Sequence, residues 1–121
     1  MLRVQNGERI PTVIDIFVDD VSSHYPNSGA LLEERLSMFP RVKKGFKILE
    51  RSSMKVSGID GQQIAYSWTS PSFEPEVVVT REVYFDTKGL IWHLSLDSSE
   101  TRAETAKADF EHMLGMFKIV D

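Results

Sequence analysis

The second half of the chain, from Lys47 to Asp121, contains four β-type runs followed by one amphipathic helical pattern, and two of the connections are short turns containing glycine. Strands joined by such turns pair antiparallel. A helix with one apolar stripe has to cover a face of the resulting sheet. This half therefore predicts an antiparallel sheet with a helix packed on it.

The four runs show the alternation of apolar and polar residues that is typical of strands. They are expected at residues 46–56, 63–69, 76–85 and 90–96. The first turn is predicted over Ser57–Gly61, where Asp60-Gly61 supplies the positive φ values of a tight hairpin. The second turn is predicted at Asp86–Gly89. Four apolar residues of the first run share one phase and are expected on one face: Phe46, Ile48, Met54 and Val56.

The first half of the chain predicts one strand and one helix. The strand, at residues 12–18, has apolar residues in both phases. Asn27 or Ser28 is expected to cap the helix, because short polar side chains accept from its free amides. Pro40 should end or kink it near Met38, since proline lacks an amide hydrogen and disfavours helical geometry before it. The apolar stripe of this helix is Leu32, Leu36 and Phe39.

The last helix is predicted to begin at a capping box formed by Thr101 and Glu104. Its apolar stripe is Ala103, Ala106, Phe110, Met113, Leu114 and Phe117. Ile119 and Val120 predict a short closing strand.

The expected order is therefore β-α-β-β-β-β-α, with an optional final β. Both phases of the first strand are apolar and Ile91 interrupts the polar phase of the last, so helices are expected on both faces of the sheet. The predicted fold class is α+β: an α/β/α sandwich with a mainly antiparallel central sheet, in a single domain 1–121.

Composition excludes several classes of protein. The net charge of −4 over 121 residues argues against nucleic-acid binding, which normally needs a basic face. The absence of cysteine excludes disulfides and thiolate metal sites. No run approaches the roughly 20 apolar residues of a membrane-spanning helix. Met1–Ile10 lacks the apolar core of a signal peptide, so the compartment is left open.

Several segments resemble the PsbP-like family, which contains the photosystem II extrinsic protein PsbP and related small bacterial proteins and lipoproteins. They are Gly45–Glu50 (Gly-Phe-Lys-Ile-Leu-Glu), Val56–Gly61 (Val-Ser-Gly-Ile-Asp-Gly), the hairpin ending at residues 89–96 and the helix end at Met116–Ile119 (Met-Phe-Lys-Ile). The resemblance covers roughly residues 15–120. It implies a PsbP-like α/β/α sandwich and, where an upstream signal has been removed, an extracytoplasmic location.

PsbP-like domains usually begin with a further hairpin, and nothing before Thr12 matches it. We therefore expect either a shortened domain without that hairpin or a domain whose upstream segment is absent from this sequence. One edge of the sheet would then be unpaired, which favours a homodimer formed by strand addition.

The sequence predicts no catalytic residue, no metal site and no cofactor. The three histidines, His24, His93 and His112, have no partner at the i+3 or i+4 spacing of helical metal ligands. No nucleophile elbow or glycine-rich phosphate loop occurs. The remaining acidic candidates lie at strand ends, where aspartate usually begins turns: Asp15, Asp19, Asp20 and Asp97. The protein is expected not to be an enzyme.

The candidate partner surface consists of the one dense basic stretch and an aromatic residue in a proline-flanked loop: Arg41, Lys43, Lys44, Lys47 and Phe73. Such cations also complement the negative end of a helix dipole, so they have a structural explanation as well. An aromatic residue in a loop either anchors a partner or folds over the sheet edge.

Three functions remain open from the sequence. The leading hypothesis is a non-catalytic interaction or assembly module of PsbP-like type that binds a protein partner. The alternative is a domain that binds a small ligand or a divalent metal in a cleft lined by His24, Asp20, His93 or Tyr25. A hydrolase or isomerase is the third, because small α+β folds host many chemistries.

Overall fold

The computed structural model describes residues 2–5, 13–20, 25–71, 75–87 and 89–117. In chain order the elements are β1 (Leu2–Gln5), β2 (Val13–Asp20), α1 (Ser28–Val42), β3 (Lys47–Val56), β4 (Ile59–Thr69), β5 (Val77–Thr87), β6 (Leu90–Ser99), the 3-10 turn η1 (Glu100–Arg102) and α2 (Ala103–Met116).

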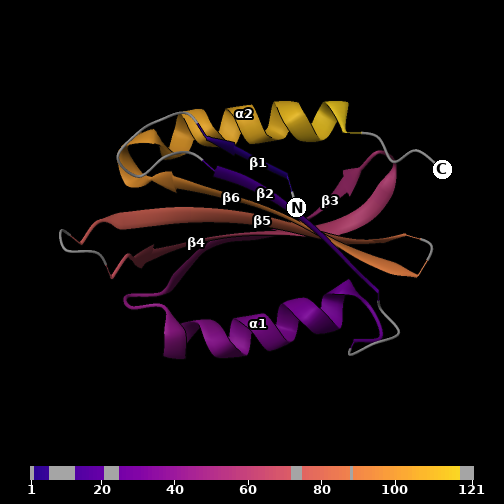
Figure 1. Ribbon diagram of the computed structural model, residues 1–121, viewed down its shortest axis with the longest axis horizontal. Helices are drawn as coiled ribbons and strands as arrows, with labels where there is room; N and C mark the ends of the chain where they lie inside the picture. The colour runs from indigo at the N-terminus through magenta and orange to yellow at the C-terminus, as the bar shows by residue number, and fades with distance from the viewer. Residues whose placement is uncertain (1, 6–12, 21–24, 72–74, 88, 118–121) are drawn as a thin grey trace.

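The strands form one six-stranded antiparallel sheet in the order β1-β2-β6-β5-β4-β3. Helix α1 connects β2 to β3, which lies at the far edge, and the meander β3-β4-β5-β6 returns to pair β6 with β2. Figure 1 shows α1 and α2 on opposite sides of the sheet. This arrangement confirms the predicted α/β/α sandwich.

Each face of the sheet carries its own apolar core. The core under α2 contains Val56, Val83, Phe85, Leu94, Leu96, Ala106, Phe110 and Leu114, with Met54, Ile59, Trp92, Met113 and Phe117 packed against it. The core under α1 contains Leu32, Phe39, Ile64, Tyr66 and Tyr84, with Leu31, Leu36, Phe46 and Trp68 around it. Both predicted helix stripes therefore face the sheet, as their spacing indicated.

Strand β1 was not expected, because the predicted order begins with the strand at residues 12–18. Its backbone pairs with β2 in a register that runs from Leu2 opposite Ile16 to Gln5 opposite Val13. A run of four residues is too short to show a reliable alternation, so its pairing depends on the neighbouring strand. The edge of β2 that was expected to favour a homodimer is therefore covered, and the sheet ends at β1 and β3.

A β-bulge in β3 corrects the predicted phase of that strand. Ile48 lies opposite Tyr66, whereas Glu50 lies opposite Ala65, so Leu49 is an extra residue without a partner position. One extra residue reverses the alternation of every residue beyond it. The residues expected on one face consequently divide between the two faces: Phe46 packs in the α1 core, whereas Met54 and Val56 pack in the α2 core.

Helix α1 continues through Pro40 to Val42, so the predicted end near Met38 is wrong. Pro40 lies in the last turn, where its missing amide removes a single helical bond. The amide of Lys43 still donates to the carbonyl of Phe39 at 2.8 Å and closes that turn. Gly45 then takes the expected left-handed conformation, with φ at +70°.

The β3–β4 turn lies earlier than predicted. Ser57 and Gly58 have positive φ values of 52° and 82°, and Val56 pairs with Ile59. Two residues with positive φ form the tight primed turn that matches the twist of a hairpin. Asp60 and Gly61, the predicted turn pair, lie within β4.

The predicted capping box is also absent. The 3-10 turn η1 places Thr101 inside a turn that precedes α2, and the residue before the helix, Arg102, makes no side-chain cap. Thr101 Oγ1 instead lies 3.3 Å from the Oγ of Ser99. The closing strand predicted at residues 119 and 120 lies outside the described residues.

Gly61 gives a direct test of how closely β4 and β5 pack. A Cβ at this position would lie 2.8 Å from the carbonyl oxygen of Tyr84 and 3.2 Å from the Cβ of Phe85. We expect Gly61→Ala to lower the free energy of unfolding by about 1–3 kcal/mol, the usual cost of overpacking. Urea denaturation measures this value.

The control is Gly115→Ala in α2. No atom beyond the helix's own backbone lies within 4 Å of a Cβ added there, and alanine should stabilise the helix by up to about 1 kcal/mol. Equal effects of the two substitutions would contradict the close approach.

Candidate functional site

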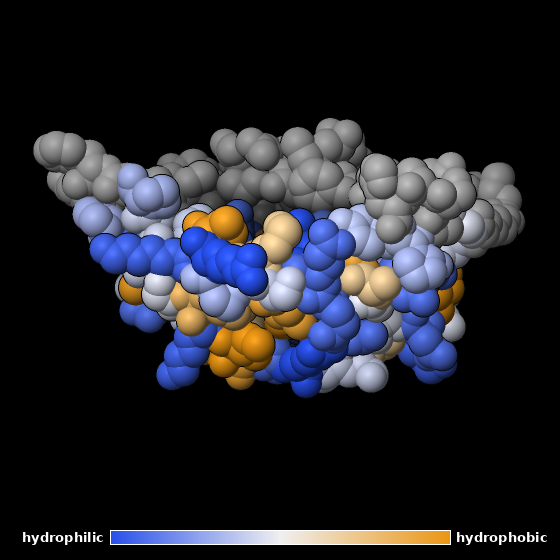
Figure 2. Space-filling model, turned by 90° about the horizontal axis from the view of Figure 1, so that it is seen from below, coloured by the Kyte–Doolittle hydropathy of each residue, from blue (hydrophilic) through white to orange (hydrophobic). Residues whose placement is uncertain are grey.

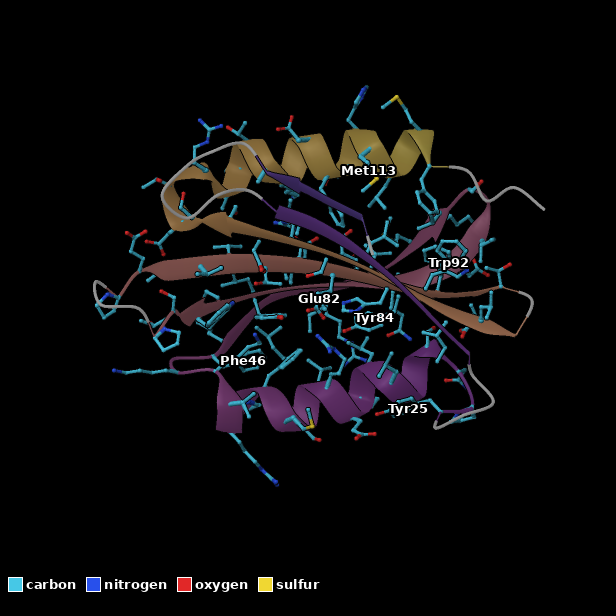
Figure 3. All side chains as sticks on the ribbon, in the orientation of Figure 1. Tyr25, Phe46, Glu82, Tyr84, Trp92 and Met113 are labelled. Atoms are coloured by element: carbon cyan, nitrogen blue, oxygen red, sulfur yellow. The ribbon has the colours of Figure 1, made fainter. Side chains whose placement is uncertain are left out.

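A cluster of ionisable side chains lies beneath α1, centred on Glu82 in β5. Alternation along β5 directs Glu82 and Tyr84 toward α1, while Val83 and Phe85 face the other core. Figure 3 shows Glu82 and Tyr84 in the middle of the sheet on the α1 side. Glu82 is only 2 % exposed. Its partners come from three other elements: Arg35 of α1, Tyr66 of β4 and His93 of β6.

The carboxylate of Glu82 is surrounded by donors. Tyr66 Oη donates to Oε2 at 2.8 Å, and Arg35 Nη2 lies 3.1 Å from the same oxygen. Tyr84 Oη donates to Oε1 and accepts from Arg35 Nε at 2.6 Å. His93 Nε2 lies 3.4 Å from Oε1, and its ring stacks on Tyr84 with centroids 4.4 Å apart. We call these five residues the Glu82 cluster.

The contacts of the Glu82 cluster fix its protonation. Burial favours the neutral form of Glu82, but the interaction with His93 and the charge of Arg35 outweigh it and lower its pKa to about 2. Burial and the Glu82 charge raise the pKa of both Tyr66 and Tyr84. Burial opposes the charge of Arg35, yet Glu82 and the two phenols leave its pKa raised. At neutral pH the carboxylate is ionised and both phenols are protonated, so the cluster holds α1 on the sheet.

The lowered pKa of Glu82 predicts a loss of stability in acid. Its pKa is about 2 in the folded chain against an ordinary value of 4.5, so the stabilisation is complete above about pH 4.5 and is lost as the pH falls toward 2. It amounts to something on the order of 3 kcal/mol. Glu82→Gln should therefore flatten the dependence of unfolding free energy on pH between 4.5 and 2. At neutral pH it should cost about 3–5 kcal/mol, because Arg35 and His93 lose a buried partner.

The control for Glu82→Gln is Glu33→Gln. Glu33 pairs with Arg51 on the surface, where both side chains are exposed. Such a pair contributes about 0–1 kcal/mol, so this variant should follow the wild-type pH dependence. Denaturation in urea at a series of pH values measures both variants. If the unfolding free energy of Glu82→Gln fell between pH 4.5 and 2 as it does in the wild type, Glu82 would not be the group that causes the loss of stability in acid.

A second contact fixes the start of α1. The backbone amide and the Oγ of Ser28 donate to the two carboxylate oxygens of Asp86, at 2.8 and 2.7 Å. Asn27 Oδ1 accepts from the amide of Ala30 at 2.9 Å, so Asn27 is the helix cap, as one of the two expected residues. The first turn of α1 is thus satisfied by side chains of the protein itself.

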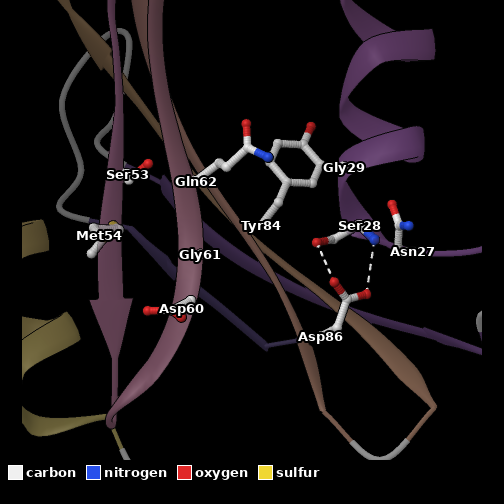
Figure 4. A pocket seen from close by; sticks show the side chains of 10 residues that line it. All are labelled: Asn27, Ser28, Gly29, Ser53, Met54, Asp60, Gly61, Gln62, Tyr84 and Asp86. Carbon is white, nitrogen blue, oxygen red and sulfur yellow. Dashed lines mark hydrogen bonds between the residues drawn. The ribbon is translucent and has the colours of Figure 1, made fainter.

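Beside this contact lies an open hollow of about 620 Å³ between the start of α1 and the β3–β4 hairpin (Figure 4). Its lining residues are Asn27, Ser28, Gly29, Ser53, Met54, Asp60, Gly61, Gln62, Tyr84 and Asp86. The two carboxylates among them are both engaged: Asp86 with Ser28, and Asp60 with Lys55 Nζ at 2.9 Å. The hollow therefore offers a ligand these two carboxylates together with neutral polar groups.

The structure divides the predicted basic stretch into two parts. Arg41, Lys44 and Lys47 are exposed where α1 ends and β3 begins, and we call them the basic corner. Among the described residues, none of these three forms an ion pair. Lys43 instead turns inward, with Nζ 4.1 Å from the ring centroid of Trp68 and also over Phe39 and Tyr66. Burial lowers the pKa of Lys43 against the opposing charges of Asp97 and Glu82.

The other candidates from the sequence do not gather into one site. His93 belongs to the Glu82 cluster, and His112 is exposed on α2. Tyr25 is half-buried before α1. His24 and Phe73 lie outside the described residues, and only the backbone of Asp20 is described. Within the described ranges, no three side chains of His, Cys, Asp or Glu are placed to hold a metal ion.

The Glu82 cluster was missed by sequence reasoning, although two signals pointed to it. Glu82 lies between two apolar runs of β5, next to Thr80 and Arg81. Arg35 lies within the apolar stripe of α1, between Leu32 and Phe39. A charge of each sign at positions that pattern assigns to the core indicates a buried pair, because an isolated charge is rarely buried.

No family model and no curated protein matches the chain. Its fold does match solved structures. It aligns with PA94, a protein of unknown function from Pseudomonas aeruginosa, at 12 % identity and a TM-score of 0.78, covering 99 % of this chain and 81 % of that one. It also aligns with LpqN, involved in cell envelope biogenesis of Mycobacterium tuberculosis, at 15 % identity and a TM-score of 0.52.

The alignment with LpqN covers 86 % of this chain and 61 % of that one, so the chain spans less than two thirds of its length. At these identities the likeness shows the fold, and membership of the PsbP-like family stays a prediction. In the part of the chain that the structure describes, neither helix has a stretch long and apolar enough to cross a membrane.

Proposed function

We propose that the protein is a non-catalytic interaction module, which binds another protein at the surface where α1 ends and β3 begins. The observation that carries the proposal is a contrast between two sets of charged groups. Those brought together inside the fold satisfy one another in the Glu82 cluster. The cations of the basic corner remain exposed and, among the described residues, without an acidic partner.

The Glu82 cluster supports this proposal because of what its groups already do. A general base needs a carboxylate or imidazole that reaches a substrate proton. Glu82 is 2 % exposed and receives donors from Tyr66, Tyr84 and Arg35. Its lowered pKa also makes it a weak base. These features fit a structural role better than acid–base chemistry.

The surface around the basic corner has the mixture of side chains that interfaces use. Four large apolar residues are exposed at the end of α1 and the start of β3: Met38 at 43 %, Val42 at 70 %, Ile48 at 48 % and Leu49 at 49 %. Figure 2, which views the molecule from the α1 side, shows apolar side chains among hydrophilic ones on this face. Interfaces are enriched in methionine and arginine, and neighbouring apolar groups left exposed mark contact surfaces.

A charge reversal at the basic corner tests the proposal. The protein is used to purify a partner from its native cells, and the complex is then rebuilt from the two purified chains. We expect Lys44→Glu to weaken that complex about tenfold, since an interfacial charge contributes on the order of 1 kcal/mol. The matched control is Ala108→Glu/His112→Glu on α2, which changes the net charge by the same amount on another surface. Isothermal titration calorimetry measures both affinities.

The alternative, a domain that binds a small ligand or a divalent metal, predicts a different result. A ligand present at 100 times its Kd stabilises the folded chain by about 2.7 kcal/mol. A thermal-shift screen with divalent metals and metabolites would detect this. A large shift with one ligand, together with failure to rebuild any protein complex, would reject the interaction module.

A further inference from the structure

Strand β3 forms one edge of the sheet, and within the described residues its outer side has no strand partner. It is ten residues long, whereas the opposite edge strand, β1, has four. An exposed edge presents amide and carbonyl groups that pair readily with another extended chain. Long edge strands of this kind are used to bind peptides by strand addition.

The bulge at Leu49 leaves two neighbouring apolar side chains exposed at this edge. Ile48 and Leu49 are 48 % and 49 % exposed, although they are consecutive in the strand. In a regular strand, consecutive side chains point to opposite faces. At this bulged edge, the side chains of Ile48 and Leu49 are both exposed. A partner strand laid along β3 would cover both of them.

Leu49 also lines a hollow of about 480 Å³ between the edge of the sheet and the start of α2. Val77 and Val79 are among its apolar lining residues, and Trp68 also borders it. Its other lining residues are Gly45, Lys47, Ser67, Thr69, Arg81, Glu100, Ala103 and Glu104. It is large enough for side chains of an extended peptide that reach inward from the edge.

Arg81 lines the hollow and is largely buried. Its side chain is 9 % exposed, and Nη1 lies 3.3 Å from Oε2 of Glu50. Its Nε is buried and has no hydrogen-bond partner among the described residues. A buried donor without a partner costs about 1–3 kcal/mol.

The charges around the edge select the kind of partner. The basic corner lies at the start of β3, where Lys47 is part of the strand and the carbonyl of Lys44 accepts from the amide of Thr69 in β4 at 2.7 Å. Glu100 and Glu104 lie on the opposite wall of the hollow. Acidic side chains of a partner therefore fit beside β3, and its apolar side chains fit into the hollow.

Two pairings of β3 with a second copy of this chain bring like charges together. A two-fold antiparallel pairing of β3 centred on Arg51 would place Arg51 opposite its own copy. A pairing centred on Ser53 would place Arg51 opposite Lys55. Like charges directly opposite each other destabilise a strand pair.

We propose that β3 binds an extended acidic segment of a partner protein, which adds a strand to the sheet and places an apolar side chain in the hollow beside Leu49. Its acidic side chains lie against Lys47 and Lys44. This inference rests on the proposed function and specifies its partner.

The test begins with a displayed library of random peptides of about ten residues, the length of a long strand. The purified protein selects binders, and the best peptide is synthesised. We expect the selected peptides to combine Asp or Glu with apolar residues, and to shift the backbone amide NMR signals of residues 47–56. Methylating alternate backbone nitrogens of the peptide should weaken binding at least tenfold, because strand addition depends on main-chain hydrogen bonds.

Variants locate the side-chain contacts. Lys47→Glu should weaken binding of the acidic peptide about tenfold, and Leu49→Asp should do so as well. The α2 control, Ala108→Glu/His112→Glu, has the same net charge as Lys47→Glu and should bind within twofold of the wild type. Thermal denaturation confirms that each variant is folded.

Several results would overturn the inference. They are the absence of any selected peptide, selected peptides without acidic residues, amide shifts confined to other elements, or no effect of backbone methylation. A dimer whose β3 signals move with concentration would also overturn it, since a second copy would then occupy the edge. The proposed function survives these results if a purified protein complex still responds to Lys44→Glu. It falls separately if no such complex forms.

Discussion

The contact between Arg35 of α1 and Glu82 of β5 joins the first helix to the centre of the sheet. A carboxylate that is 2 % exposed costs several kcal/mol to bury unless donors replace its water. Here the donors come from α1, β4, β5 and β6, so the charge is compensated only when all four elements are in place. A helix held by apolar contacts tolerates small shifts along a sheet, whereas directional bonds of 2.6–3.1 Å define one position. The rest of the α1 face depends on this position.

The two faces of the sheet are therefore stabilised by different kinds of contact. Under α2, the contacts are mainly apolar and aromatic, including Trp92 stacked on Phe85 with centroids 5.7 Å apart. Under α1, aromatic rings surround a charged centre, and Lys43 lies over Trp68 at the end of the helix. Because Lys43 points inward, the exposed basic corner consists of Arg41, Lys44 and Lys47 without it. The interior arrangement thus determines which charges a partner meets.

The edges of the sheet differ for a related reason. Because α1 carries the chain from β2 across to the far side, β3 becomes an outer strand, while β1 covers β2. The bulge at Leu49 then exposes apolar side chains next to the end of α1 and the hollow at the start of α2. Lys47 of the basic corner and Leu49 of the unpaired edge, within the described residues, both line the hollow at the start of α2. The strand order places β3 at the edge of the sheet, and the features around it follow from that position.

The sequence by itself determined the presence of the four strands of the meander, the apolar stripes of both helices and, from these, the α/β/α sandwich. These patterns are local, because a residue's face depends on its distance along the same element. Tertiary structure decided what local patterns do not encode: the pairing of β1 with β2, the reversal of phase at Leu49, and the continuation of α1 through Pro40. It also assembled the Glu82 cluster from residues as far apart in the chain as Arg35 and His93. Compensation of a buried charge depends on distance in space, so only the folded chain shows which groups provide it.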